Sequence, residues 1–112
     1  MKLTFCSYIA IMWSMEVRFV DGRLDQLEID PKFNAGFAQN IVSAFRRRMQ
    51  QIRSAPDERV FYQLKSLQFE KLKGKRSHQH SMRLNKQGRL IMKFEGRGAS
   101  KRAVIISIED YH

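Results

Sequence analysis

Apolar and polar residues alternate between residues 15 and 20, and this two-residue period predicts a half-buried β-strand. The Asp-Gly pair at 21–22 should end that strand. Apolar residues spaced through 24–28 favour a short helical turn, which the Asp-Pro pair at 30–31 interrupts. The pattern therefore predicts a strand followed by a brief helical segment.

A longer helix is expected next, because apolar residues recur at spacings of three and four and so share one helix face. These residues are Phe37, Ile41, Phe45, Met49 and Ile52. Asn34 is the predicted N-cap, and the arginines at 46–48 stand in the C-terminal half, where the helix dipole favours cations. Pro56 opens a second predicted helix, whose buried side would be Val60, Phe61, Leu64 and Leu67.

Three more strands are predicted, at 81–85, 89–95 and about 102–110. The first two form a hairpin around a tight turn at 86–88, and residues 96–101 form a loop before the last strand. The order β-α-α-β-β-β predicts an α+β domain, with one or two N-terminal helices packed on one face of a twisted, mostly antiparallel sheet. The other sheet face is then open for a ligand.

Length and composition indicate one domain with a modest core, since the chain has 112 residues of which 43% are hydrophobic. The single cysteine, Cys6, excludes an internal disulfide and a cysteine metal cage. The lone cysteine fits a reducing, cytoplasmic setting, and no apolar run is long enough for a transmembrane helix. Residues 1–14 are interpreted as an extension or a misplaced start, because the alternative, a signal peptide, lacks a small-x-small cleavage site.

Positive charge is concentrated in one segment of the chain. The formal net charge is +10 and the isoelectric point is about 10.3. Residues 71–102 hold eleven Lys and Arg against one acid, Glu95, so this segment alone accounts for the whole net charge. A localised excess of this kind points to a polyanionic partner, with nucleic acid as the first candidate and an anionic membrane surface as the second.

Two groups of residues could act on a phosphodiester. Arg83 and Arg89 both point away from the apolar sets of their strands, so they can share the open face and clamp a phosphate. Tyr111 and His112 directly follow the last strand, and RNA cleavage without a metal needs proton-transfer groups beside positive charge. The alternative for the two arginines is that they are solvated or pair with Glu95 and Glu109, and the alternative for the terminal pair is that it has no role.

The basic loop offers further contacts to a nucleic-acid backbone, which need only charge and reach. Its candidate residues are Lys71, Lys73, Lys75, Arg76, His78 and His80, and Lys93 joins them from the strand face that carries Arg89. A metal site made by the two loop histidines with His112 is the alternative, and the surrounding cations disfavour it. The acids Asp21, Asp25, Glu28 and Asp30 are interpreted as a solvated segment around a helix start.

Three stretches carry a resemblance to a known family: Leu-Lys-Gly-Lys-Arg at 72–76, Ser-Met-Arg-Leu-Asn-Lys-Gln-Gly-Arg-Leu-Ile at 81–91, and Ile-Ser-Ile-Glu-Asp-Tyr-His at 106–112. In this order they resemble the HigB branch of the RelE-type toxins of bacterial toxin–antitoxin pairs. That pattern has a Leu-Lys-Gly-(Asp/Lys)-Arg loop, a Ser-x-Arg-x-Asn-x-Gln-Trp-Arg hairpin and a terminal Asp-Tyr-His. The resemblance covers residues 15–112 as a single domain, and residues 1–14 have no counterpart.

The resemblance implies a RelE-like fold with a curved antiparallel sheet and a metal-independent, ribosome-dependent endoribonuclease that cuts mRNA without a cofactor. It also implies a cognate helix-turn-helix antitoxin of the HigA type as partner. By position, the active-site set would be Lys73, Arg89, Asp110, Tyr111 and His112, with Arg83 as an added candidate. In this reading His112 transfers the proton, Arg89 and Lys73 hold the scissile phosphate, and Tyr111 orients the substrate.

Two positions depart from the family pattern, and the milder change is His80, at a position that is often aromatic. The tryptophan that precedes the hairpin arginine is replaced here by Gly88. A large-to-small change in a packed region leaves a cavity or a looser strand and costs several kcal/mol as an order of magnitude. The alternative function is therefore a catalytically impaired module of the same fold, which binds RNA and the antitoxin without cleaving.

Overall fold

The computed structural model describes residues 15–97 and 101–110 of the chain. In chain order the elements are β1 (Glu16–Phe19), α2 (Gly22–Ile29), α3 (Gln39–Ser54), α4 (Arg59–Gln63), β2 (Glu70–Lys71), β3 (His80–Arg83), β4 (Gly88–Glu95) and β5 (Arg102–Asp110). Single 3₁₀ turns lie at Lys65–Leu67 and Gly74–Arg76. Within the described part of the chain, no helix is long and apolar enough to cross a bilayer.

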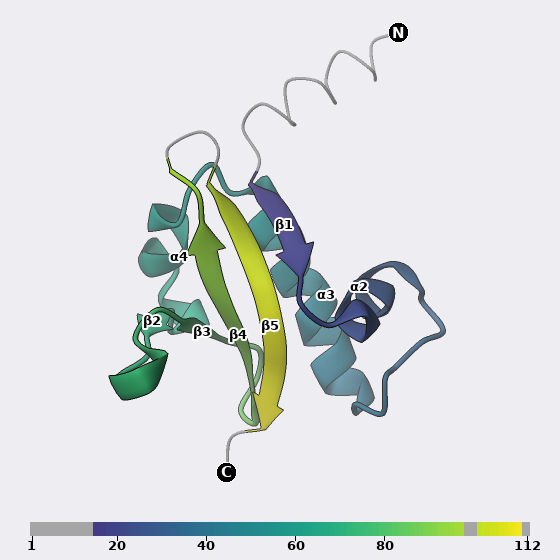
Figure 1. The fold of residues 1–112 in the computed structure, drawn as a ribbon. Coiled ribbons are helices and arrows are strands. Elements are labelled where there is room, and N and C mark those ends of the chain that lie inside the picture. The colour runs from purple at the N-terminus through teal and green to yellow at the C-terminus, as the bar shows by residue number, and fades with distance from the viewer. Residues whose placement is uncertain (1–14, 98–100, 111–112) are drawn as a thin grey trace, which may run out of the picture.

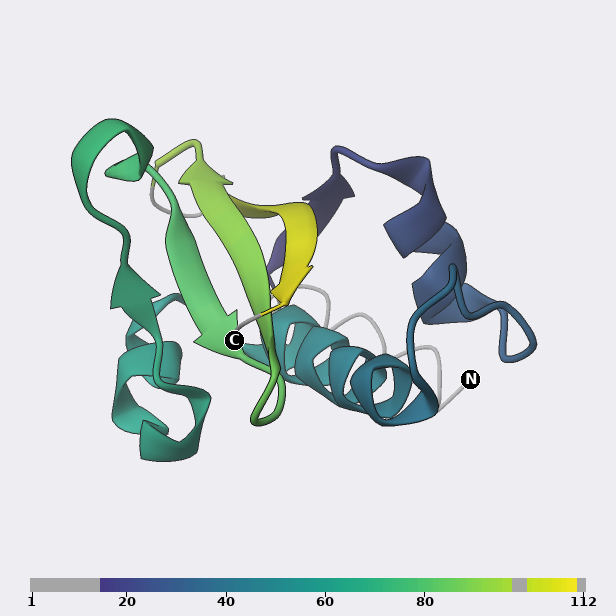
Figure 2. The same cartoon turned by 90° about the horizontal axis from the view of Figure 1, so that it is seen from below.

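The five strands form one sheet in the order β1-β5-β4-β3-β2. β1 runs parallel to β5, and the other three pairs are antiparallel. α3 crosses one face of the sheet, α2 lies beyond the β1 edge, and α4 lies near the opposite edge (Figures 1 and 2). The predicted α+β class, with helices on a mostly antiparallel sheet, is confirmed.

The core lies between α3 and the sheet. The apolar stripe predicted for the helix is buried there, with Phe45, Met49 and Ile52 at 0% exposure. The strands contribute the residues that alternate toward α3, among them Met82 and Leu90, also at 0%. Full burial of side chains of this size stabilises the fold by about 1.5–3 kcal/mol each. Because the inward residues of β3 and β4 pack here, their alternate residues face away from α3.

The beginning of α3 differs from the prediction that Asn34 is its N-cap. The helix begins at Gln39, with Ala38 at the N-cap position and no side-chain cap. Ala35 and Gly36 have positive φ angles of 53° and 84°, which a right-handed helix cannot accommodate. The amide oxygen of Asn34 instead accepts a hydrogen bond from the backbone N–H of Gly36 within this turn. Phe37 thus precedes the helix, although it still packs against the core.

Two arginines of the 46–48 run have structural roles. Arg46 donates to the backbone carbonyls of Leu27, Asp30 and Phe33, at 3.0, 2.8 and 3.2 Å. It thereby satisfies carbonyl groups at the C-terminal end of α2 and in the following loop, where intrahelical donors run out. Arg48 donates to the carbonyl of Arg83 at 2.9 Å, which ties α3 to the end of β3.

The second predicted helix is shorter than expected. α4 ends at Gln63, and a separate 3₁₀ turn brings Leu67 into the core at 0% exposure. Leu64, expected on the buried side, adopts an extended backbone and is 39% exposed. The break rotates the chain, so the three-to-four spacing of a continuous helix no longer applies beyond Gln63.

Gly88 is the first residue of β4 rather than part of the turn, and it faces α3. A Cβ atom at this position would lie 2.6 Å from the Cδ1 atom of Ile41, closer than any ordinary contact. The expectation that the missing tryptophan leaves a cavity is therefore wrong, because Ile41 occupies the space. The turn itself is held by Asn85, whose side-chain oxygen accepts from the N–H groups of Gln87 and Gly88.

Candidate nucleic-acid interface

The candidate site is built on the sheet face opposite α3, around a row of charged residues across three strands. Arg83 on β3 pairs with Arg89 on β4, and Arg89 pairs in turn with Glu109 on β5. Directly paired residues point to the same side of a sheet, with Cβ atoms about 4.5–5.5 Å apart. The prediction that Arg83 and Arg89 share a face is confirmed by this register.

Arg89 is held more firmly than a surface arginine. Its guanidinium donates to the hydroxyl of Ser81 at 3.0 Å and to the carbonyl of Gln68 at 2.8 Å, and it lies 3.5 Å from a carboxylate oxygen of Glu70. Its side chain is 11% exposed. Gln68 has a φ angle of 45°, a left-handed conformation that is uncommon outside glycine and that often marks functional positions. Contacts of this kind fix the direction of the guanidinium before any ligand arrives.

An ion pair attaches the basic loop to β5. Arg76 donates to both carboxylate oxygens of Glu109, at 2.6 and 3.3 Å, and also to the side chain of Gln79. Of the two acids considered as partners for the strand arginines, Glu109 thus pairs with Arg76, while Glu95 lies near Arg18. The loop that carries Lys73 and Lys75 is consequently brought to the end of the strand that leads to Asp110. Both lysines are exposed.

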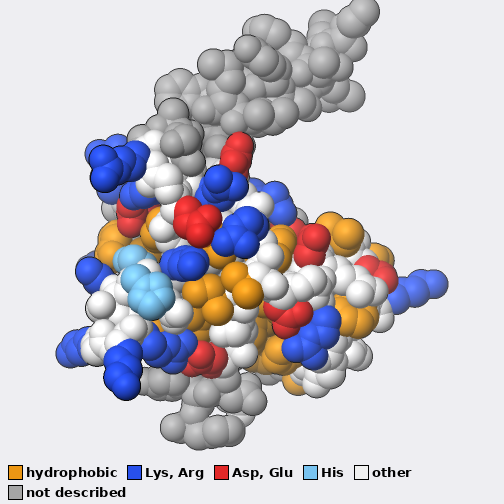
Figure 3. All heavy atoms as spheres, viewed as in Figure 1, with side chains coloured by type: hydrophobic (Ala, Val, Ile, Leu, Met, Phe, Trp, Pro, Cys, Tyr) orange, Lys and Arg blue, Asp and Glu red, His pale blue; other side chains and the backbone are white. Residues whose placement is uncertain are grey.

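A hollow of about 250 Å³ lies beside the two strand arginines. It is lined by Gln68, Arg83, Asn85, Lys86 and Arg89. Lys and Arg side chains gather over the part of this face that carries β2, β3 and the basic loop (Figure 3). Three cations and two amides around one hollow can hold a phosphate group by charge and by hydrogen bonds.

The remaining predicted site residues are distributed as follows. Lys93 lies on the same sheet face, 3.9 Å from Glu95, and Lys71 and His78 are exposed, the first on β2 and the second in the loop. Asp110 pairs with Gly88 through the register of β5, and its side chain lies outside the described residues. Tyr111 and His112 also lie outside them, as do residues 1–14 with Cys6 and residues 98–100.

His80 is separated from the other candidates because it faces the helix side of the sheet. Its ring stacks on Phe69 with a centroid distance of 5.0 Å and meets Phe94 edge-on at 5.4 Å. The Nδ1 atom is buried and has no hydrogen-bond partner within the described part of the chain. These contacts place the ring of His80 among aromatic side chains and away from Arg89 on the other sheet face.

Acidification should destabilise the protein through His80. Burial lowers the pKa of His80 below its usual 6.5, with Lys71 and Lys101 acting in the same direction and Glu58 opposing them. The unfolded chain therefore binds a proton first, so the free energy of unfolding falls as the pH drops below about 6.5 and levels off below the folded-state pKa. When the pH is lowered from 7.5 to 5, the melting temperature of the wild type should fall more than that of His80→Phe. Equal falls in the two melting temperatures would contradict this prediction.

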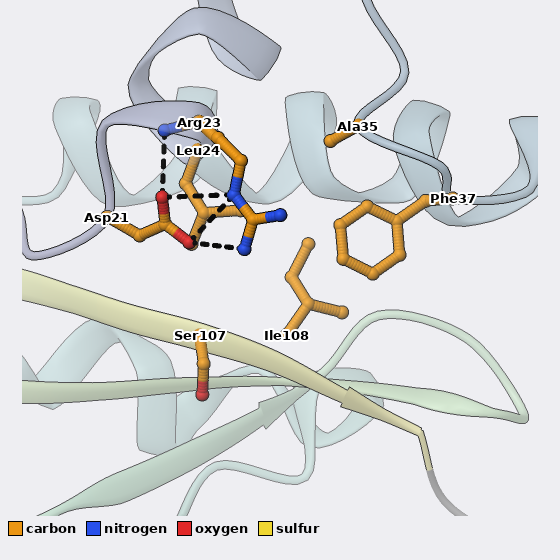
Figure 4. A pocket seen from close by; sticks show the side chains of 7 residues that line it. All are labelled: Asp21, Arg23, Leu24, Ala35, Phe37, Ser107 and Ile108. Atoms are coloured by element: carbon orange, nitrogen blue, oxygen red, sulfur yellow. Dashed lines mark hydrogen bonds and ion pairs between the residues drawn. The ribbon is translucent and has the colours of Figure 1, made fainter.

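Two of the acids interpreted as a segment around a helix start, Asp21 and Glu28, have structural partners. Asp21 caps α2 by accepting from the N–H of Arg23 at 2.9 Å, and it pairs with the same side chain, which lowers the pKa of the Asp21 carboxyl. The pair borders a small hollow of about 80 Å³, whose other walls include Phe37 and Ile108 (Figure 4). Glu28 forms a two-point ion pair with Arg53.

Sequence reasoning missed the groups that orient Arg89. Ser81 belongs to the Ser-x-Arg motif, so its position was visible although its role was not. The carbonyl of Gln68 has no signal in residue type, because every residue carries one. Within residues 15–97 and 101–110, no cluster of three or more His, Cys, Asp or Glu could hold a metal ion.

Comparison with solved structures identifies the fold. The chain is similar to the YoeB/ParE toxin from Agrobacterium tumefaciens, with a TM-score of 0.55 and 17% identity over 88% of this chain and 100% of that chain. It is also similar to a conserved hypothetical protein from Helicobacter pylori, with a TM-score of 0.50 and 11% identity over 87% and 94% of the two chains. No family model and no curated sequence matches. The chain thus has the RelE-like fold shared by YoeB/ParE-type toxins.

Proposed function

We propose that this protein is the toxin of a type II toxin–antitoxin system, an endoribonuclease that cuts mRNA on the ribosome and so inhibits translation. The observation that carries the proposal is the row of Arg83, Arg89 and Glu109, with the basic loop attached to it through Arg76. The row lies on the sheet face opposite α3 and leads to the Asp-Tyr-His terminus that resembles the HigB pattern. The fold of YoeB/ParE-type toxins is consistent with it.

In the proposed reaction, some residues supply positive charge and others transfer a proton. Arg89, oriented by Ser81 and Gln68, would hold the scissile phosphate and stabilise the negative charge that develops on it. Lys73 and Arg83 would add charge from the loop and from β3. His112 would move the proton, Tyr111 would orient the nucleotide, and Asp110 would complete the terminal set. Side chains alone suffice for this chemistry, so we propose a metal-independent reaction without a cofactor.

The partners follow from the same proposal. The residues that would contact the RNA backbone are Lys71, Lys75, Arg76, His78 and Lys93. We leave His80 out of this proposed set because its ring packs on Phe69 on the helix side of the sheet. A HigA-like helix-turn-helix antitoxin would neutralise the toxin, and both would act in the cytoplasm. The alternative, a module impaired by Gly88, is less well supported, because Gly88 faces α3 and Arg89 lies on the other sheet face with its partners in place.

Primer extension on a defined mRNA in a reconstituted translation reaction tests this function. Wild-type protein should produce cuts within ribosome-occupied codons. Arg89→Lys keeps the charge but loses the planar guanidinium that reaches Ser81 and Gln68, so cleavage should fall about 10²–10³-fold.

Arg59→Lys is the matched control. Arg59 is an exposed arginine on α4 that pairs with Asp57, so its replacement should leave cleavage unchanged. Intact mRNA in the wild-type reaction would contradict the nuclease and favour the binding module. Equal cleavage by wild type and Arg89→Lys would remove Arg89 from the site.

A further inference from the structure

A second hollow lies on the other side of the β3–β4 hairpin, between the hairpin tip and α3. It has a volume of about 390 Å³ and is lined by Asn40, Arg47, Asn85, Lys86 and Gln87. Asn85 and Lys86 also line the hollow beside Arg89, so the two hollows adjoin at the hairpin tip. We refer to the two hollows, which share Asn85 and Lys86 at the hairpin tip, as the track.

Arg47 differs from its two neighbours in the arginine run. Arg46 and Arg48 donate to backbone carbonyls, whereas the guanidinium of Arg47 is exposed and has no hydrogen-bond or ion-pair partner among the described residues. Lys86 at the hairpin tip is exposed in the same way. Arg47 and Lys86 are therefore available to a ligand, while Arg46 and Arg48 are engaged in the fold.

Positive charge is concentrated around the two hollows. Neither lining contains a carboxylate, although Glu70 lies 3.5 Å from Arg89, which lines one of them. Burial lowers the pKa of Arg48 on α3, and the neighbouring charges of Arg47 and Arg83 lower it further. Arg47 and Arg83 thus lie close enough to repel Arg48, and an anion bound between the hollows would reduce this repulsion.

The residues that line the two hollows indicate which type of anion binds there. Both consist of cations and side-chain amides, and neither contains an apolar side chain. A protein partner would need apolar anchors at the centre of its contact, whereas a phosphate backbone needs charge and hydrogen-bond donors. A path around the hairpin tip also suits a flexible single strand better than a rigid duplex. The occupant that fits is single-stranded RNA.

We propose that the hollow between α3 and the hairpin tip is a second RNA-binding subsite, in which Arg47 and Lys86 bind backbone phosphates. RNA that occupies the hollow beside Arg89 would continue around the tip of the hairpin into this subsite. The statement that the bound RNA is the substrate rests on the proposed function. The binding of RNA by Arg47 and Lys86 does not, because it can be measured without cleavage.

Fluorescence anisotropy with labelled single-stranded RNA tests the subsite. Wild type, Arg47→Gln, Lys86→Gln and the double variant would be titrated with oligonucleotides of about four and about twelve nucleotides over a range of salt. The double variant should bind the longer RNA about tenfold more weakly, with a salt slope smaller by about 1.4, as expected for two lost phosphate contacts to a single strand. The shorter RNA, which can remain beside Arg89, should lose less.

Lys32→Gln combined with Lys65→Gln is the matched control, since it removes two exposed charges outside both hollows. Affinity and salt slope of the double variant equal to those of this control would overturn the proposal. Displacement of the RNA by a polyglutamate peptide of equal charge and length, as effectively as by unlabelled RNA, would also overturn it in favour of an acidic protein. If the variants of Arg47 and Lys86 bind RNA more weakly but the wild type does not cleave mRNA, only the proposed nuclease activity would be contradicted.

Discussion

Replacing His112 with alanine should abolish mRNA cleavage and growth arrest while the domain stays folded. The row that defines the site contains Arg83 and Arg89, which cannot release a proton near neutral pH, and Glu109, which is engaged by Arg76. A histidine at the end of β5 would supply the missing proton transfer, and such groups contribute about 10²–10⁴-fold to rate. Primer extension and colony counts after induction would measure the loss.

Deletion of residues 111–112 should have the same effect as His112→Ala, because both remove the proton-transfer group. Melting temperatures should match the wild type, since the last residues of a domain usually contribute little to its core. A surface change in the loop after α2, Lys32→Ala, controls for expression. Growth arrest by the truncated protein would assign proton transfer to another residue.

Restoring the family tryptophan at position 88 should destabilise the protein. Even a Cβ atom at Gly88 would lie 2.6 Å from Ile41 Cδ1, so an indole must displace the helix side chain or the strand. Overpacking of this kind costs about 1–3 kcal/mol. Urea denaturation should give a lower free energy of unfolding for Gly88→Trp, and the melting temperature should fall by several degrees.

A pair of further variants separates overpacking from a general effect of tryptophan. Gly22→Trp is the control, because apart from its chain neighbours and its own helix backbone nothing lies within 4 Å of a Cβ at that exposed glycine. Ile41→Ala should cost about 2–5 kcal/mol alone, but it should cost less in combination with Gly88→Trp, because the indole can use the vacated volume. A rise in stability for Gly88→Trp alone would mean that the missing tryptophan is a defect and that Ile41 moves aside.

Most of the fold could be predicted because its signals are local. The alternation through 15–20, the three-to-four spacing that buries Phe45 and Met49, and the β4 and β5 strands all appear in the structure. The start of α3 could not be predicted, because Ala35 adopts a left-handed conformation that alanine rarely takes. The break after Gln63 was also missed, since the apolar spacing runs through it.

The candidate site, like the fold, could be predicted from the sequence only in part. Parity along two short strands was enough to place Arg83 and Arg89 on one face, since side chains alternate in every strand. The same argument, applied to His80, would have assigned it to the core face with Met82. The partner of Glu109 was out of reach, because Arg76 is 33 residues away and the contact depends on how the basic loop crosses the sheet.

The sequence by itself determined the class of fold, the segment that carries the positive charge and the faces of the strands. These properties depend on residue type and on periodicities of a few residues, so they can be predicted without knowing which distant segments meet. Only the tertiary structure decided which arginines serve the fold and which remain available: Arg46 closes α2, Arg89 is fixed by Ser81 and Gln68, and Arg47 stays exposed beside the hairpin. The physical reason is that a guanidinium binds whatever acceptors the packing of distant segments brings within about 3 Å.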